Sequence, residues 1–114
     1  MPDEASIPRN PYHRKALSEA RKLIKRVRAK LHPIKVFLFG SVARGDVHEL
    51  SNINLVIVAD FKGTRRDRVE QILDIAQDLK LTFPVEPFPL RPEEFQTVRK
   101  RPFFRHIARE AVEV

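Results

Sequence analysis

The sequence predicts an α/β (α+β) fold, a short mixed β-sheet with helices packed mainly on one face. Two observations predict it. Helical and extended patterns follow each other in the order helix, strand, turn, strand, helix, extended segment, helix, helix. The chain has 114 residues, of which 42% are hydrophobic, as in globular proteins. We therefore expect one domain over residues 1–114, with the Pro-rich start, residues 1–10, flexible.

The first element is a long helix that begins near Pro11 and ends at His32-Pro33. Its apolar residues recur at spacings of three and four, which is the pattern of one helical face: Leu17, Ala20, Ile24, Val27 and Leu31. The opposite face is basic and carries Arg14, Lys15, Arg21, Lys22, Lys25, Arg26 and Arg28.

Two buried strands follow. Residues 34–39 are apolar apart from Lys35 and lie between Pro33 and Gly40, which is typical of a short buried strand. Residues 53–59 are rich in β-branched side chains and predict the second strand. The polar residues 42–51 connect the two, with one helical turn expected at their start.

A second long helix is expected over residues 64–80, after a turn at Lys62-Gly63. Thr64 and Asp67 have the spacing of a capping box, with Asp in place of the usual Glu. The apolar periodicity predicts a buried face made of Val69, Ile72, Leu73, Ala76 and Leu79.

The third extended segment, residues 82–90, contains prolines at 84, 87 and 89. Because proline cannot donate to a β-ladder, we expect an edge strand or one that pairs only briefly. Pro92 and Pro102 each open a short helix. The second of these helices is expected to bury Phe103 or Phe104, Ile107, Ala108 and Ala111.

Composition bounds the class of protein. No apolar run is long enough to span a bilayer and the start has no signal-peptide pattern, so we expect a cytoplasmic protein without a membrane partner. Cysteine is absent, which excludes disulfides, thiolate zinc sites and cysteine nucleophiles. A charged fraction of 32%, nine prolines and one methionine would also suit a thermophile.

The net charge of +7 is carried by residues 1–35, which have ten basic and three acidic residues, because residues 36–114 have twelve of each. The basic helix face could bind RNA through counterion release. It could equally be a solvated face with ion pairs to acidic residues of the helix at 64–80. Tyr12 is the only aromatic residue nearby, so we favour the solvated face over RNA binding.

The connection after the first strand contains the chemistry-bearing motif. A strand that ends in Gly40-Ser41 and enters a helical turn can bind phosphate, because glycine lets the backbone approach an anion and free N–H groups point at it. Neither a P-loop nor a dinucleotide fingerprint is present. Asn52 and Asn54 occupy alternate positions at the start of the second strand, so their side chains share one face.

The full string is more specific than the turn alone. Gly40-Ser41-x-Ala43-Arg44-Gly45, a gap of five, and Ser51-Asn52-Ile53-Asn54-Leu55 resemble the signature G-S-x-A-R-G-x(5)-S-D-I-D-L. This is the signature of the minimal nucleotidyltransferases, small members of the DNA polymerase beta superfamily that include MNT-type antitoxins. The resemblance covers residues 12–112, including the ending Pro102-Phe103-Phe104-x-x-Ile107-x-x-Glu110.

The resemblance implies a role for each motif position. Gly40 and Ser41 would hold the triphosphate of ATP or another NTP, and Arg44 would bind phosphate or brace the loop. In the family, two aspartates and a third carboxylate bind two Mg²⁺ ions, which neutralise phosphate charge during nucleoside monophosphate (AMP) transfer. Those ligand positions fall on Asn52, Asn54 and Glu86, and Glu86 is the candidate catalytic carboxylate.

Asparagine keeps one carbonyl oxygen of the aspartate it replaces but loses the charge. A unit charge pair at 4 Å contributes roughly 4 kcal/mol at an effective dielectric near 20. We therefore expect weak Mg²⁺ binding and an impaired or inactive transferase. Three explanations stay open: a naturally degenerate member (a pseudoenzyme), an engineered Asp-to-Asn variant, or slow residual chemistry through amide carbonyls. Asp46 and Glu49 lie in the connecting loop and are not expected to enter the site.

The alternative to an enzyme is a non-catalytic binding module. The resemblance suggests an antitoxin-like partner of a helical HEPN-domain protein, since small nucleotidyltransferases form toxin–antitoxin modules with such proteins. Adjacent helical residues cannot both face one core, so the exposed member of Phe103-Phe104 could also contribute to a homo-oligomer contact.

Overall fold

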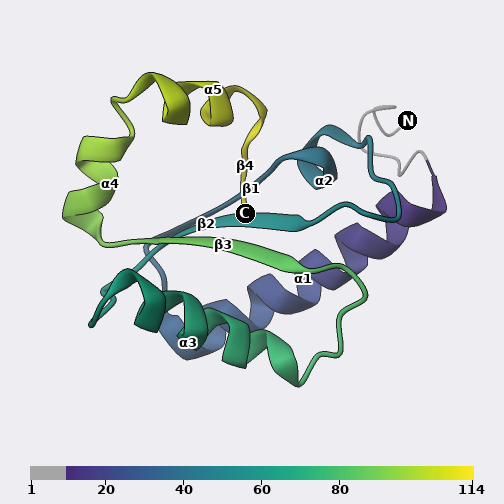
Figure 1. The fold of residues 1–114 in the computed structure, drawn as a ribbon, viewed down its shortest axis with the longest axis horizontal. Helices are drawn as coiled ribbons and strands as arrows, with labels where there is room; N and C mark the ends of the chain where they lie inside the picture. Colours follow the sequence, from purple (N-terminus) through teal and green to yellow (C-terminus); the bar gives the residue numbers. More distant parts are fainter. Residues whose placement is uncertain (1–9) are drawn as a thin grey trace.

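The computed structural model describes residues 10–114, so the predicted flexible segment 1–10 lies, apart from Asn10, outside the described residues. The elements follow the predicted order, with one short strand added at the end (Figure 1). They are α1 (Pro11–Leu31), β1 (Lys35–Phe39), α2 (Ser41–Arg44), β2 (Ile53–Val58), α3 (Arg65–Gln77), β3 (Val85–Leu90), α4 (Pro92–Val98), α5 (Pro102–Glu110) and β4 (Val112–Glu113).

The sheet is mixed, as predicted, with the strand order β3-β2-β1-β4. β1 is antiparallel to both β2 and β4, whereas β3 runs parallel to β2. β3 lies at the edge, where the missing N–H groups of Pro87 and Pro89 can face away from the ladder. The sequence did not predict β4, because two residues are too short to show an alternating pattern.

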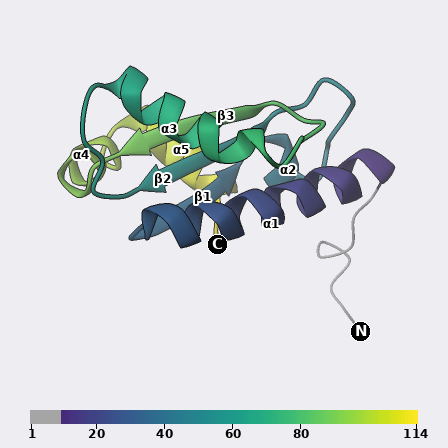
Figure 2. The same cartoon turned by 90° about the horizontal axis from the view of Figure 1, so that it is seen from below.

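The two long helices, α1 and α3, pack side by side on one face of the sheet (Figures 1 and 2). They enclose the larger core, which is mostly aliphatic and includes Leu23, Val27, Ile53, Leu55, Ile57 and Ile72, all with no exposed surface. Strands β1 and β2 alternate between this core and the opposite face, as an extended chain requires.

The short helices α4 and α5 cover part of the second face (Figure 1). The core there is smaller and more aromatic, built from Phe39, Val56, Val58, Phe95, Phe104 and Ile107. Phe95 contacts Phe104 edge to face, with ring centroids 5.6 Å apart. The predicted fold class is therefore confirmed, with the two long helices on one face and the two short ones on the other.

The capping box of α3 is confirmed, but part of its predicted buried face is wrong. Thr64 N donates to Asp67 Oδ2 at 2.9 Å and Asp67 N donates to Thr64 Oγ1 at 3.2 Å. Leu73 is 41% exposed, and Ile75 is buried in its place. The apolar stripe of this helix is wider than its contact with α1 and the sheet, so a residue at the edge of the stripe lies in solvent.

Helix α5 decides between the two adjacent phenylalanines. Phe104 is buried and Phe103 is 68% exposed. The prediction that Ala108 is buried is wrong, because Phe104 and Ile107 make the contact with the sheet and leave the alanine methyl exposed.

Helix α1 begins and ends where the sequence predicts. Asn10 Oδ1 accepts a hydrogen bond from His13 N at 2.8 Å, and His32 ends the helix in the left-handed conformation. The buried face also includes His13 and Glu19, which the apolar pattern does not identify. Glu19 Oε1 accepts from Thr82 N and Phe83 N, which fastens α1 to the segment before β3.

The basic face of α1 is largely without acidic partners. Within residues 10–114, this face has one ion pair to α3 or to the turn after α3, between Arg26 and Asp78 at 3.6 Å.

Across the described part of the chain, no helix is both long enough and apolar enough to cross a bilayer.

Candidate functional site

Three strand ends bring the motif residues together. Across the sheet, Phe39 is opposite Asn54 and Asn54 is opposite Glu86, so the end of β1 and the starts of β2 and β3 form one row. Gly40 directly follows Phe39 and leads into α2, which lies beside the ends at which β2 and β3 begin (Figure 1). The structure therefore brings Gly40, Asn54 and Glu86 together at the same end of these three strands, and this row of strand ends is the edge of the sheet discussed below.

Gly40 is required by its conformation and by its neighbour. Its φ of 77° and ψ of −155° lie in a region that only glycine adopts readily. A Cβ at this position would also clash with Nδ2 of Asn54. The turn and the Asn54 side chain are consequently in direct contact, which was not apparent from their separation in the sequence.

Asn54 presents an unsatisfied acceptor at the centre of this row. Its Oδ1 is buried and accepts no hydrogen bond from any residue in the range 10–114. A buried acceptor without a partner costs about 1–3 kcal/mol. The Asn54 amide is therefore held in this row at a cost in stability, which is unusual for a buried polar group.

Asn52 and Glu86 lie next to each other beside Asn54. The Asn52 amide nitrogen donates to Glu86 Oε2 at 3.5 Å, a long and weak hydrogen bond. The Glu86 side chain is exposed, and it is the one carboxylate that the structure places in the row. The sequence-based grouping of Asn52, Asn54 and Glu86 thus corresponds to a real spatial cluster.

The buried side chain of His13, in α1, contacts helix α2. His13 Nε2 lies 3.1 Å from the Val42 carbonyl oxygen, and a Cβ on Gly45 would stand 3.5 Å from His13 Cε1. Ser41 is partly exposed at the first position of α2. The first N–H groups of this helix have no acceptor within the helix, as at any helix start, so they are available to an anion.

Arg44 makes contacts that brace the loop. Its Nη1 donates to Glu110 Oε2 at 2.7 Å, and its Nε donates to Asp46 Oδ1 at 3.3 Å. The hydrogen bond to Glu110 raises the pKa of Arg44, with a further contribution from Asp46. Arg44 thereby connects α2 to the end of α5.

The residues present do not fit a two-metal site. Mg²⁺ prefers anionic oxygen in near-octahedral geometry, and this edge offers one carboxylate with two amide oxygens. Between Asn10 and Val114, no group of three or more His, Asp or Glu side chains could hold a metal ion. Asp46 is engaged with Arg44 and Glu49 is exposed, so neither supplies the missing charge.

Sequence reasoning missed two supporting residues. His13 carries no functional signal in the sequence, and its burial against Val42 follows from the packing of α1 under α2. Glu110 was noted in the C-terminal pattern without a role, and its partner Arg44 lies 66 residues away in the sequence. Neither contact has a local sequence signal, because each depends on how distant elements are placed.

Comparison with known protein families gives a match over most of the chain. A family profile described as "Polymerase beta, Nucleotidyltransferase" matches residues 21–111. No curated protein is significantly similar to the chain in sequence.

Solved structures share the fold. A protein from Sulfolobus solfataricus assigned as a nucleotidyltransferase has a TM-score of 0.61 and 19% identity, and the match covers 99% of this chain and 87% of that one. A toxin–antitoxin structure with AMP-PNP has a TM-score of 0.58 and 20% identity, over 82% of this chain and 70% of that one. A mutant of the toxin–antitoxin MntA-HpeT has a TM-score of 0.57 and 21% identity, with the same coverage of 82% and 70%.

Proposed function

The chain belongs to the polymerase beta nucleotidyltransferase family, and on that premise we propose that it is an impaired nucleoside monophosphate transferase that binds an NTP. The observation that carries the proposal is the row of Gly40, Asn54 and Glu86, with the unsatisfied Oδ1 of Asn54 at its centre. The row adjoins the Gly40-Ser41 turn, which supports triphosphate binding as the proposal, and Asn52 and Asn54 stand where the family signature has aspartate.

Charge decides how much activity such a site can support. Glu86, Asn52 and Asn54 have one negative charge between them, so their affinity for Mg²⁺ is expected to be low. Gly40 and Ser41 would still receive the triphosphate through backbone N–H groups, which need no metal. Binding of ATP with little or no transfer of AMP is the expected behaviour.

The test compares the chain with its reverted form, Asn52→Asp/Asn54→Asp, by calorimetric titration with ATP in the presence and absence of Mg²⁺. We expect Mg²⁺ to strengthen ATP binding at least tenfold in the reverted chain and much less in the original. Glu86→Gln in the reverted background is the matched control and should remove most of the gain. Transfer of label from α-labelled ATP is measured on the same samples.

Two outcomes contradict the proposal. If neither chain binds ATP, the row is not a nucleotide site. If the original chain transfers AMP as fast as the reverted one, the two asparagines do not impair it.

A second candidate function is that of a binding module over residues 1–114, acting as the antitoxin-like partner of a helical HEPN-domain protein. It is supported by the fold shared with structures of toxin–antitoxin complexes and by the exposed Phe103. Co-expression with the product of an adjacent gene encoding a helical HEPN-type protein tests it by size-exclusion chromatography. A stable complex that survives Asn52→Asp/Asn54→Asp supports the module, whereas separate elution of the two proteins contradicts it.

A further inference from the structure

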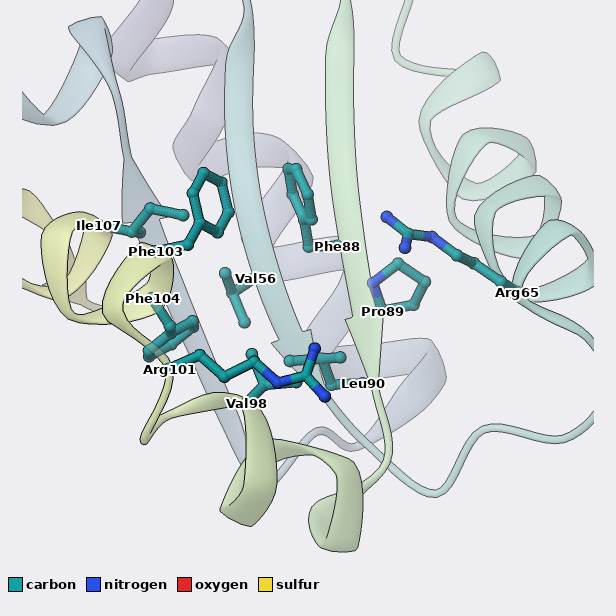
Figure 3. A pocket seen from close by; sticks show the side chains of 10 residues that line it. All are labelled: Val56, Arg65, Phe88, Pro89, Leu90, Val98, Arg101, Phe103, Phe104 and Ile107. Carbon is teal, nitrogen blue, oxygen red and sulfur yellow. The ribbon is translucent and has the colours of Figure 1, made fainter.

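An apolar cavity lies on the same sheet face as the candidate site, beyond it along β2 and β3. It has a volume of about 250 Å³ and is formed between the sheet, α5, the end of α4 and Arg65 at the start of α3 (Figure 3). Val56 lies two positions after Asn54, and Phe88 two positions after Glu86, so both project from the same face as the row described above. The cavity shares no lining residue with that row.

The body of the cavity is apolar. Val56, Leu90, Val98 and Ile107 line it together with Pro89 and three aromatic rings, Phe88, Phe103 and Phe104. Figure 3 shows Phe103 and Phe88 standing on either side of Val56. Phe103 is 68% exposed and forms part of the open rim of this apolar cavity.

Among residues 10–114, the polar side chains that line the cavity are those of Arg65 and Arg101. The Arg65 guanidinium lies 5.8 Å from the centroid of the Phe88 ring, a cation–π contact. Within residues 10–114, neither guanidinium has an ion pair or a hydrogen bond to another side chain. Both positive charges therefore stand beside an apolar space that contains no compensating carboxylate.

The chemistry of the lining selects its ligand. Guanidinium groups donate hydrogen bonds and cannot accept them, so the polar part of a ligand must be an acceptor, and a negative charge is favoured by two nearby cations. A nucleobase presents donors as well as acceptors, and no lining side chain could accept from it. We propose that this cavity binds a compact apolar organic anion, an aryl or short-chain carboxylate or sulfonate, with its apolar body between Phe103 and Phe88 and its charge at Arg65 and Arg101.

The proposal is tested with two fluorescent probes of the same shape. The arylsulfonate 1-anilinonaphthalene-8-sulfonate carries the charge, and N-phenyl-1-naphthylamine lacks it. We expect the charged probe to bind at one saturable site and at least tenfold more tightly than the neutral probe. Arg101→Gln should weaken the charged probe about tenfold and leave the neutral probe unchanged, because a charge-assisted contact is lost. Phe103→Ala should weaken both probes.

Arg105→Gln is the matched control. Arg105 is an exposed arginine of α5, the helix that Arg101 precedes, and it does not line the cavity. It should bind both probes like the original chain. Equal affinity for the two probes, equal losses in Arg101→Gln and Arg105→Gln, or no saturable binding would each overturn the proposal. Displacement of the charged probe by ATP would also overturn it, because the cavity would then belong to the nucleotide site. The result is independent of whether the chain binds ATP at all.

Discussion

The two faces of the sheet differ in how completely helices cover them. The face covered by α1 and α3 is closed, with an aliphatic core in which the largest residues have no exposed surface. The face covered by α4 and α5 is only partly closed and holds the row of Gly40, Asn54 and Glu86, the apolar cavity and the exposed Phe103. The two faces share the same strands.

Strand β2 shows how one segment serves both faces. Ile53, Leu55 and Ile57 point into the closed core, whereas Asn54 and Val56 point to the open face. The alternation of an extended chain separates them without any additional structure. The closed side therefore holds the larger core, whereas the other side has, within residues 10–114, the buried Asn54 oxygen without a partner and the apolar cavity.

The largest expected effect tests this asymmetry with one residue type. Ile57→Ala on the closed face should lower the free energy of unfolding by about 4 kcal/mol, because its site is fully packed. Ile107→Ala on the open face should lower it by about 2 kcal/mol, because this side chain already borders a cavity. Urea denaturation of both variants provides the measurement. Equal losses would mean that isoleucines on the two faces contribute equally to the free energy of unfolding.

The next largest effect is expected at Gly40, in the turn between β1 and α2. Gly40→Ala should cost about 2–3 kcal/mol, since the new Cβ adds a clash with Asn54 to the strain of a positive φ. Gly45→Ala is the matched variant, with a φ of 95° and ordinary contact with His13, and should cost about 1 kcal/mol. Thermal unfolding compares the two. A smaller loss for Gly40→Ala than for Gly45→Ala would show that Asn54 moves away easily.

The smallest losses in unfolding free energy are expected at two arginine–glutamate ion pairs. Glu94 accepts from Arg91 N at 2.7 Å and from the buried Arg68 at 2.6 Å, so Glu94→Gln should cost about 1–2 kcal/mol, allowing for the partial exposure of the carboxylate. Glu110→Gln should cost less than about 1 kcal/mol, because Arg44 is exposed and keeps Asp46 as a partner.

The pH dependence of the Glu94 variant provides a second measurement. The hydrogen bond from Arg91 N, followed by the contacts with Arg68, lowers the pKa of Glu94 below its ordinary value of 4.5. Its stabilising contribution is therefore complete above pH 4.5 and is lost as the pH falls through the lowered folded pKa. The difference in unfolding free energy between the original chain and Glu94→Gln should be constant near neutral pH and shrink in acid. A difference that grows in acid would contradict this assignment.

Local chemistry made much of the fold predictable from the sequence. The Thr64–Asp67 capping box, the Pro11 and Pro102 helix starts and the edge position of the proline-containing β3 each follow from properties of a few neighbouring residues. The row was predictable in outline because Gly40 and Asn54 belong to one signature string and Glu86 is the carboxylate of the next extended segment. The exposure of Leu73 was not, since periodicity identifies a stripe but not its contact width.

The sequence by itself determined which elements form and which family they belong to. These depend on helical and extended periodicity and on residue identity, which are local. Only the tertiary structure decided that Phe104 rather than Phe103 is buried, that Arg44 pairs with Glu110, and that Arg65 and Arg101 meet at one cavity. Each of these depends on distances between elements far apart in the chain, which are set when the helices pack onto the two faces of the sheet.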